Sequence, residues 1–333
     1  MRPLRLRKLL KRKLPLLVFL ILLVVAFSVA FYIYRNSPVE PLSPEAYKEL
    51  EARLVTLVED EDPRVALHAL QEEIDRSESV LRSCHGLVHE IGHEAYEKYG
   101  DVAKAFSYRD EICGAGYIHG VIESYMDDKG FEESELSSIC TSYKGEDRDN
   151  CFHGVGHGLM FYTRNDVPAS ITSCHALTDA KARMRCAEGV FMENFESDDV
   201  FHLSEYVDDN DLFGICREQK EIYQKGACYF YAPLFYLNEH ERDYADMFAL
   251  CREAEAPYIS TCIKGTSSRV TKENIERPSL VSSYCMKQKG YEGACVEGIG
   301  SYYYTHYGDT KKVEELCSKV AKDYMSACTS TLK

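Results

Sequence analysis

The sequence predicts an all-α fold, a solenoid of disulfide-stapled helical hairpins behind one N-terminal transmembrane helix. Apart from two, the 14 cysteines fall into six pairs, with nine to eleven residues between the members of each pair. The second members lie 35, 42, 34, 33 and 33 residues apart, a period typical of helix-turn-helix repeats. No strand-like alternation of useful length is present. The pairs are Cys140/Cys151, Cys174/Cys186, Cys216/Cys228, Cys251/Cys262, Cys285/Cys295 and Cys317/Cys328.

The number of cysteines indicates an oxidising compartment, because structural disulfides are rare in a reduced cytosol. No Cys-x-x-Cys motif occurs, which argues against a zinc ribbon or a thioredoxin-like site. A bridge within each pair would staple one hairpin and stabilise it by roughly 3 kcal/mol. The remaining Cys84 and Cys113 are expected to pair with each other across a longer loop. The sequence alone does not prove this connectivity.

The N-terminus predicts a membrane anchor. A basic segment, 1–13, precedes an uncharged and mostly apolar segment, 14–34, that is long enough to cross a bilayer as a helix. The basic flank is expected to stay cytoplasmic, which places the rest of the chain outside the cell as a single-pass protein of the cell membrane. The alternative is a cleaved signal peptide, since Ser28 and Ala30 satisfy the small-residue rule for cleavage.

Charge is divided sharply along the chain. Residues 1–35 carry eight basic and no acidic side chains, whereas the remainder carries a net charge of −23. A surface of this sign repels phosphate backbones, so nucleic acid is not expected as a partner. Solubility is the simpler reason for the acidic balance.

Two helices are expected between the anchor and the cysteine pairs. Residues 35–43 form a tether with two prolines, and residues 44–83 carry apolar side chains at helical spacing. Ser43 before Pro44 is typical of an N-cap followed by the first helical residue, and Asp62-Pro63 is expected to end the first helix and open the second.

Residues 84–333 form the predicted cysteine-rich helical-repeat domain. In most repeats a glycine follows the second cysteine after three residues, where it allows neighbouring helices to approach closely. Cys228 lacks this glycine, and its repeat also has the longest interval. The matching phrases are Cys113 to Gly116, Cys151 to Gly154, Cys186 to Gly189, Cys262 to Gly265 and Cys295 to Gly298.

The last repeat, from Cys295 to Cys328, continues with an aromatic run, 302–304, and then Gly308-Asp309. This arrangement resembles the cysteine-rich, disulfide-stapled helical repeats of secreted bacterial proteins related to tetratricopeptide repeats. The resemblance covers residues 84–333 in rhythm, although cysteine spacing differs and the usual alanine and tryptophan positions are missing. It implies an architecture of stacked helical hairpins and does not imply an activity.

Histidines gather in the first repeats and predict a metal site. Two i, i+4 pairs, His89/His93 and His153/His157, each place two imidazoles on one helix face, the usual way in which helices present nitrogen to Zn²⁺ or another transition metal. Alignment on the glycines places His93, His119, His157 and Met192 at one equivalent position. Stacked hairpins would bring these histidines together on an inner surface. The predicted ligands are His89, His93, His119, Glu123, His153, His157 and Glu193, and the ion is zinc or another transition metal.

Residues 89–93 spell His-Glu-Ile-Gly-His, which resembles the zinc-binding helix of the zincin metallopeptidases. The resemblance implies that His89 and His93 bind Zn²⁺ and that Glu90 is the general base. Neither the third histidine of the metzincins nor a substrate-holding strand is found. A half-buried row of packing histidines explains the same pattern equally well.

The leading functional prediction is a membrane-anchored extracytoplasmic protein that binds a protein or small-molecule ligand on the inner face of its solenoid. A zinc-dependent hydrolase of the metallopeptidase kind, using the motif from His89 to His93, is the alternative. Other metal-dependent hydrolytic or redox chemistry and a scaffold without metal also remain open.

Overall fold

The computed structural model describes residues 41–110, 112–130, 133–196, 204–240, 242–275, 277–320 and 322–332. These residues form helices and no strand, so the all-α prediction is confirmed for them. They belong to one compact unit, Glu40–Lys333. The predicted membrane segment, 14–34, lies outside the described residues. Among the described helices, none has the length and apolar character needed to cross a bilayer.

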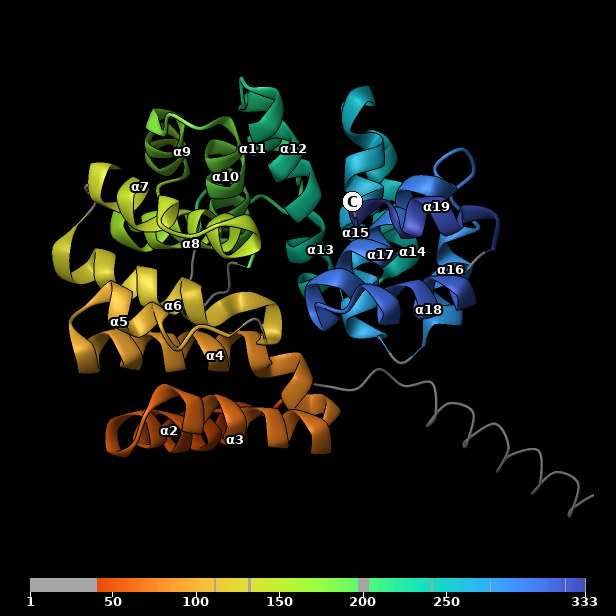
Figure 1. The fold of residues 1–333 in the computed structure, drawn as a ribbon. Helices are drawn as coiled ribbons and strands as arrows, with labels where there is room; N and C mark the ends of the chain where they lie inside the picture. Colours follow the sequence, from red (N-terminus) through yellow and green to blue (C-terminus); the bar gives the residue numbers. More distant parts are fainter. Residues whose placement is uncertain are drawn as a thin grey trace, which may run out of the picture. The chain divides into compact units, whose positions relative to one another are not determined.

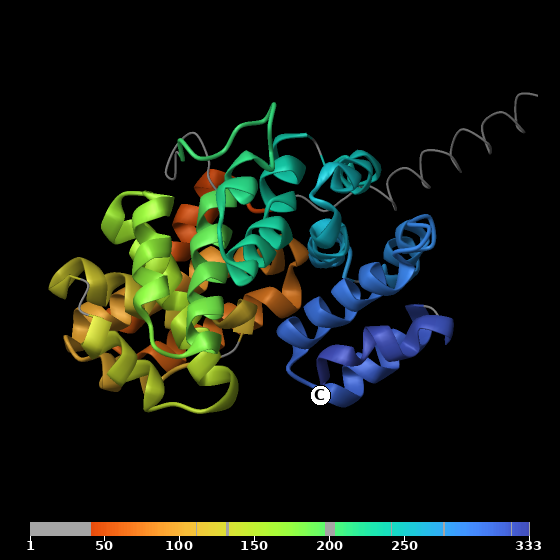
Figure 2. The ribbon, with the colours of Figure 1, turned by 90° about the horizontal axis from the view of Figure 1, so that it is seen from above.

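Figures 1 and 2 show the helices in two views. The α-helices are α2 (Pro44–Asp60), α3 (Pro63–Arg76), α4 (Glu78–Tyr99), α5 (Val102–Phe106), α6 (Ile112–Lys129), α7 (Glu133–Thr141), α8 (Gly145–Thr163), α9 (Val167–Ala176), α10 (Ala180–Phe195), α11 (Gly214–Glu218), α12 (Ile222–Tyr231), α13 (Pro233–Glu239), α14 (Tyr244–Leu250), α15 (Ile259–Glu273), α16 (Pro278–Cys285), α17 (Glu292–Tyr307), α18 (Thr310–Val320) and α19 (Met325–Cys328). Within the part of the chain that the structure describes, the 3₁₀ helices are η1 (Cys251–Glu253), η2 (Ala256–Tyr258), η3 (Lys322–Tyr324) and η4 (Ser330–Leu332).

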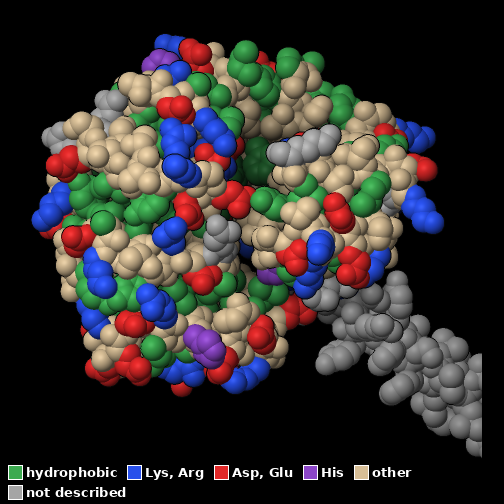
Figure 3. Space-filling view, viewed as in Figure 1, with side chains coloured by type: hydrophobic (Ala, Val, Ile, Leu, Met, Phe, Trp, Pro, Cys, Tyr) green, Lys and Arg blue, Asp and Glu red, His purple; other side chains and the backbone are tan. Residues whose placement is uncertain are grey.

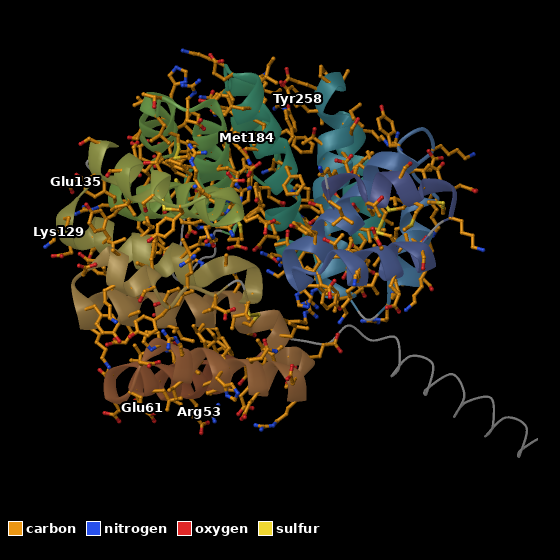
Figure 4. The ribbon with its side chains drawn as sticks, viewed as in Figure 1. Arg53, Glu61, Lys129, Glu135, Met184 and Tyr258 are labelled. Atoms are coloured by element: carbon orange, nitrogen blue, oxygen red, sulfur yellow. A yellow bond between two sulfur atoms is a disulfide. The ribbon has the colours of Figure 1, made fainter. Side chains whose placement is uncertain are left out.

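The first two helices begin at Pro44 and Pro63, as predicted. The Ser43 hydroxyl accepts a hydrogen bond from the backbone N–H of Ala46 at 3.3 Å. The Asp62 carboxylate accepts one from Arg64 at 2.8 Å. A side-chain pair then joins α2 to α3, because Arg53, labelled in Figure 4, donates to Glu73 at 2.9 Å. Each cap satisfies an N–H group that the first turn of a helix leaves unpaired.

Seven disulfides staple the helices that follow, and their pairing agrees with every predicted bridge. The six regular bridges span sequence separations of 10 to 12 residues, and Cys84–Cys113 spans 29. No free cysteine remains in the chain. All 14 cysteines are therefore structural, and the oxidising compartment predicted from their number is supported.

The longer helices pack against one another in chain order. The packed pairs are α4 with α6, α6 with α8, α8 with α10, α10 with α12, α12 with α15, and α15 with α17. Glycines stand at several of these crossings. At Gly265 of α15, for example, an added methyl group would lie 2.8 Å from the carbonyl carbon of Phe230 on α12. These glycines set the close helix spacing that the Cys-x-x-Gly phrases predict.

Helix α6 departs from the regular pattern at its N-terminal end. Cys113, Gly114 and Ala115 adopt left-handed backbone angles, with φ of 54°, 73° and 60°. Left-handed angles are unfavourable for residues with a Cβ, and here the Cys84–Cys113 bridge holds the segment in place. The turn changes the helical register between Cys113 and the rest of α6.

Candidate metal centre

Four consecutive long helices supply the polar side chains of one buried cluster. Helix α4 carries His85, His89 and His93 at intervals of four residues, so the three rings share one face. Helix α6 adds His119 and Glu123, helix α8 adds His153 and His157, and helix α10 adds Glu193.

Glycine packing aligns these helices and corrects the predicted register. His119 lies level with His89 and His153, and not with His93 and His157, because the left-handed turn shifts α6. We call the aligned positions the inner row; its first members are His89, His119, His153 and Glu188, and from α6 onward a glycine follows each of them. An added methyl group would lie 2.8 Å from the His89 carbonyl carbon at Gly120, 3.2 Å from the His119 Cα at Gly154, and 3.1 Å from the His153 carbonyl carbon at Gly189.

The first histidine group consists of His85, His89 and His119. The two Nε2 atoms of His85 and His89 are 3.1 Å apart, and Nδ1 of His119 is 3.3 Å from Nε2 of His89. Two nitrogens bound to one tetrahedral Zn²⁺ at about 2.0–2.1 Å are separated by roughly 3.3 Å. The spacing of these nitrogens therefore fits a single transition-metal ion.

The outer nitrogens of this group are held by oxygen acceptors. Nδ1 of His85 donates to the carbonyl oxygen of Cys113 at 2.6 Å. Nδ1 of His89 donates to the Glu123 carboxylate at 3.2 Å. Both Nε2 lone pairs therefore face each other. Oxygen acceptors on the outer nitrogen are the usual means of orienting metal-binding histidines.

The second group consists of His119, His153 and His157. Nε2 of His153 and Nε2 of His157 are 3.1 Å apart, and Nδ1 of His157 donates to Glu193 at 2.7 Å. The rings of His119 and His157 are stacked, with centroids 4.8 Å apart. His119 thus belongs to both groups. In each group the three ligand atoms lie within 4.8 Å of one another.

The third group joins the zincin-like motif to α6. The Glu123 carboxylate accepts from Nε2 of His93 at 2.6 Å and from His89, and these three residues also satisfy the spacing for a metal ion. Glu90 lies 3.5 Å from Nδ1 of His93, on the other side of that ring. In this position Glu90 orients His93.

Burial favours the neutral form of His85, His119 and His153, whereas at His157 the hydrogen bond to Glu193 outweighs burial and raises the pKa. Burial and the neighbouring imidazoles hold the pKa of His119 well below the usual range, and burial, Arg185 and the imidazoles do so for His153. Burial and His89 lower the pKa of His85 to about 3. Neutral imidazole is the form that binds a metal ion. Burial also acts on His93, but hydrogen bonds to Glu123 and Glu90 outweigh it and raise its pKa to about 10.

Several polar atoms in the cluster have no partner. They are Nε2 of His119, Nδ1 of His153 and Oε1 of Glu123, all buried from solvent. A buried polar atom without a hydrogen bond costs about 1–3 kcal/mol, so such atoms are rare in native proteins. Bound metal would satisfy some of them, and this is a second sign that the cluster is a ligand set.

The cluster opens on a cavity of about 920 Å³. His85, His119 and His153 are on its wall, and Figure 3 shows the surface hollowed between the segments that carry α12 and α15. Met184, labelled on α10 in Figure 4, lines the same cavity. An ion held by His85, His89 and His119 would therefore keep one coordination position accessible to a ligand or to water.

The structure brings together all seven predicted ligands, together with His85, which is not in the predicted set. His85, His89 and His93 repeat at i, i+4 and i+8, and this spacing was the available signal. Glu90, predicted as a general base, is near the cluster but is not among the residues that line the cavity. His175 lies apart and contacts Tyr223.

Replacing Glu123 tests the carboxylate that orients His89 and His93. Glu123→Gln removes a charge that accepts hydrogen bonds from both rings, and the affinity for Zn²⁺ is expected to fall 10- to 100-fold. A competition titration against a chromogenic chelator measures this change. The control is Glu97→Gln, at an exposed position on α4, the helix that carries His89 and His93. Equal affinities of the two variants would contradict this role for Glu123.

No protein-family model matches the chain, and neither a curated protein nor a solved structure matches it. The functional inference therefore depends on the chemistry of the site itself.

Proposed function

We propose that this chain is an extracytoplasmic, metal-binding α-solenoid, in which a transition-metal ion presents an open coordination position to a ligand cavity. Segment 14–34 anchors the chain in the cell membrane, with the basic residues before it in the cytoplasm. The first ion is bound by His85, His89 and His119, and zinc is the expected metal because three histidines with an open position suit it. The second histidine group offers a place for a second ion.

One observation supports this proposal most strongly, the pair of Nε2 atoms of His85 and His89 at 3.1 Å. Both outer nitrogens donate to oxygen acceptors, so two lone pairs face each other, and a cation between them would relieve their repulsion. A proton on His85 is disfavoured because its pKa is about 3. A proton on His89 can donate well to only one neighbour, whereas a metal ion accepts lone pairs from both His85 and His119.

Metal-dependent hydrolysis is the second candidate function, supported by the position of the first group on the cavity wall. An ion held there would supply Lewis-acid activation of water for hydrolysis near neutral pH. A reaction of the zincin type would need Glu90 to face that water, yet Glu90 contacts Nδ1 of His93. Binding of a ligand at the ion is therefore the preferred function.

The test is the metal content of the full-length chain after Zn²⁺ loading and dialysis, measured by inductively coupled plasma mass spectrometry. Wild type is expected to retain at least one equivalent, and His85→Ala is expected to lose one equivalent because it removes a nitrogen of the first group. The control is His68→Ala, whose ring is 77% exposed on α3. A wild-type chain without metal, or a His85→Ala chain with unchanged content, would overturn the proposal.

A further inference from the structure

The cavity beside the histidines extends to the C-terminal helices and has an aromatic lining there. Phe230 and Tyr231 of α12 and Tyr302 and Tyr304 of α17 are on its wall. Its volume of about 920 Å³ is within the range of small-molecule sites. A flat, largely apolar wall of this kind suits the organic part of a small ligand.

Four of the five lysines and arginines on the cavity wall are neutralised by carboxylates. The pairs are Lys181 with Asp149 at 2.5 Å, Arg185 with Glu188, Lys264 with Glu297 at 2.6 Å, and Arg269 with Glu273 at 3.0 Å. The fifth cation, Lys272 of α15, has no hydrogen bond or ion pair to any described residue.

Lys272 is half-buried and lies on the cavity wall without a carboxylate bonded directly to it. Burial and the nearby Arg269 lower the pKa of Lys272 to about 8, although Glu196 opposes this. Glu196, at the end of α10, is also on the wall and interacts electrostatically with both Lys272 and His85. The unpaired lysine and the first histidine group therefore belong to one continuous region of the cavity.

The charge of this region favours an anion. The ammonium group of Lys272 has no carboxylate bonded to it, and an oxyanion of a ligand would form a charge-assisted hydrogen bond with it. Lys272 and Glu196 offset each other, whereas a divalent ion among neutral imidazoles adds two positive charges to the same region. This part of the argument rests on the proposed function.

We propose that the cavity binds a small organic anion, whose carboxylate or phosphate group pairs with Lys272 while its apolar part lies against Tyr231 and Tyr302. The shared chemistry is one oxyanion group on an apolar body the size of an aromatic ring. Lys272 is the group that selects for negative charge, and the positive charge of the ion at His85 favours the same ligands.

Isothermal titration of the Zn²⁺-loaded full-length chain with phenyl phosphate and with benzoate tests this inference and separates phosphate from carboxylate. At least one of the two is expected to bind. Lys272→Met is expected to weaken that binding at least tenfold with unchanged metal content, whereas Lys272→Arg retains it within a few-fold. Lys289→Met, at an exposed lysine, is the control.

The outcomes are distinguishable. If neither anion binds the loaded chain, or if Lys272→Met binds as wild type does, the inference is overturned and the metal proposal is unaffected. If the chain holds no metal but binds an anion through Lys272, the metal proposal fails and the anion site stands. Circular dichroism establishes that each variant is folded, and Lys272→Arg keeps the test decisive if Lys272→Met does not fold.

Discussion

Reducing the disulfides of the full-length chain is expected to unfold the helical unit and to release its metal. Each bridge closes a loop that stabilises the fold by roughly 3 kcal/mol in the chain-entropy model. Domains are stable by about 5–15 kcal/mol in total, so the loss of all seven bridges exceeds the available stability. Circular dichroism at 222 nm with and without a phosphine reductant, alongside a zinc-release assay, measures both effects.

Two bridge variants separate the metal site from general stability. Cys84→Ala/Cys113→Ala removes the bridge beside His85, whose Nδ1 donates to the Cys113 carbonyl, so loss of metal is expected in a chain that remains helical. Cys317→Ala/Cys328→Ala removes a bridge near the C-terminus and is expected to retain the metal. Complete reduction, verified by alkylation of 14 thiols, that leaves the melting transition unchanged would refute the expectation.

Gly265→Ala and Gly226→Ala are expected to change stability in opposite directions. A methyl group at Gly265 would lie 2.8 Å from the Phe230 carbonyl carbon, so α15 must move away from α12. Overpacking costs about 1–3 kcal/mol, and a clash with backbone belongs at the upper end. Gly226 has nothing within 4 Å of an added methyl group, and alanine should stabilise α12 by about 0.5–1 kcal/mol.

Thermal unfolding measures this pair. A loss of about 3 kcal/mol corresponds to a melting temperature lower by roughly 5–10 °C in a unit of this size. Gly226→Ala is the matched control, since the same substitution is made on a neighbouring helix. If both variants melt together, then close helix contact is not what these glycines provide.

Local signals in the sequence were sufficient for the helices and the bridges. Ser43 and Asp62 are the N-caps of α2 and α3. The short loop within each cysteine pair makes the other member of the pair the nearest partner for a disulfide. The histidines were predicted to converge, and they do, because the glycine spacing on α8 and α10 is regular. The caps, the bridges and the glycine spacing all depend on residues that are close in sequence.

The predicted register of α6 was wrong because the left-handed turn that sets it is not part of a periodic sequence pattern. The left-handed angles at Cys113 and Ala115 shift His119 by one turn, and neither residue favours that conformation. His85 lies one turn before His89, outside the positions that the glycines mark as equivalent, so the predicted ligand set lacks it. Lys272 could not be found from the sequence, since its place depends on one cavity being lined by Lys272, Glu196 and His85, which are far apart in the chain.

In the inner row, the side chain that lines the cavity and the glycine that sets the helix spacing belong to different residues. Beyond Glu188 the row continues with Phe230, Lys264 and Glu297, while Gly265 and Gly298 keep the same contact with the preceding helix. Substitution at a row position therefore alters the lining and leaves the helix crossing intact. The downstream half of the chain offers ready attachment points for new ligand sets, and an engineered histidine pair at Lys264 and Glu297 would be presented as His119 and His153 are.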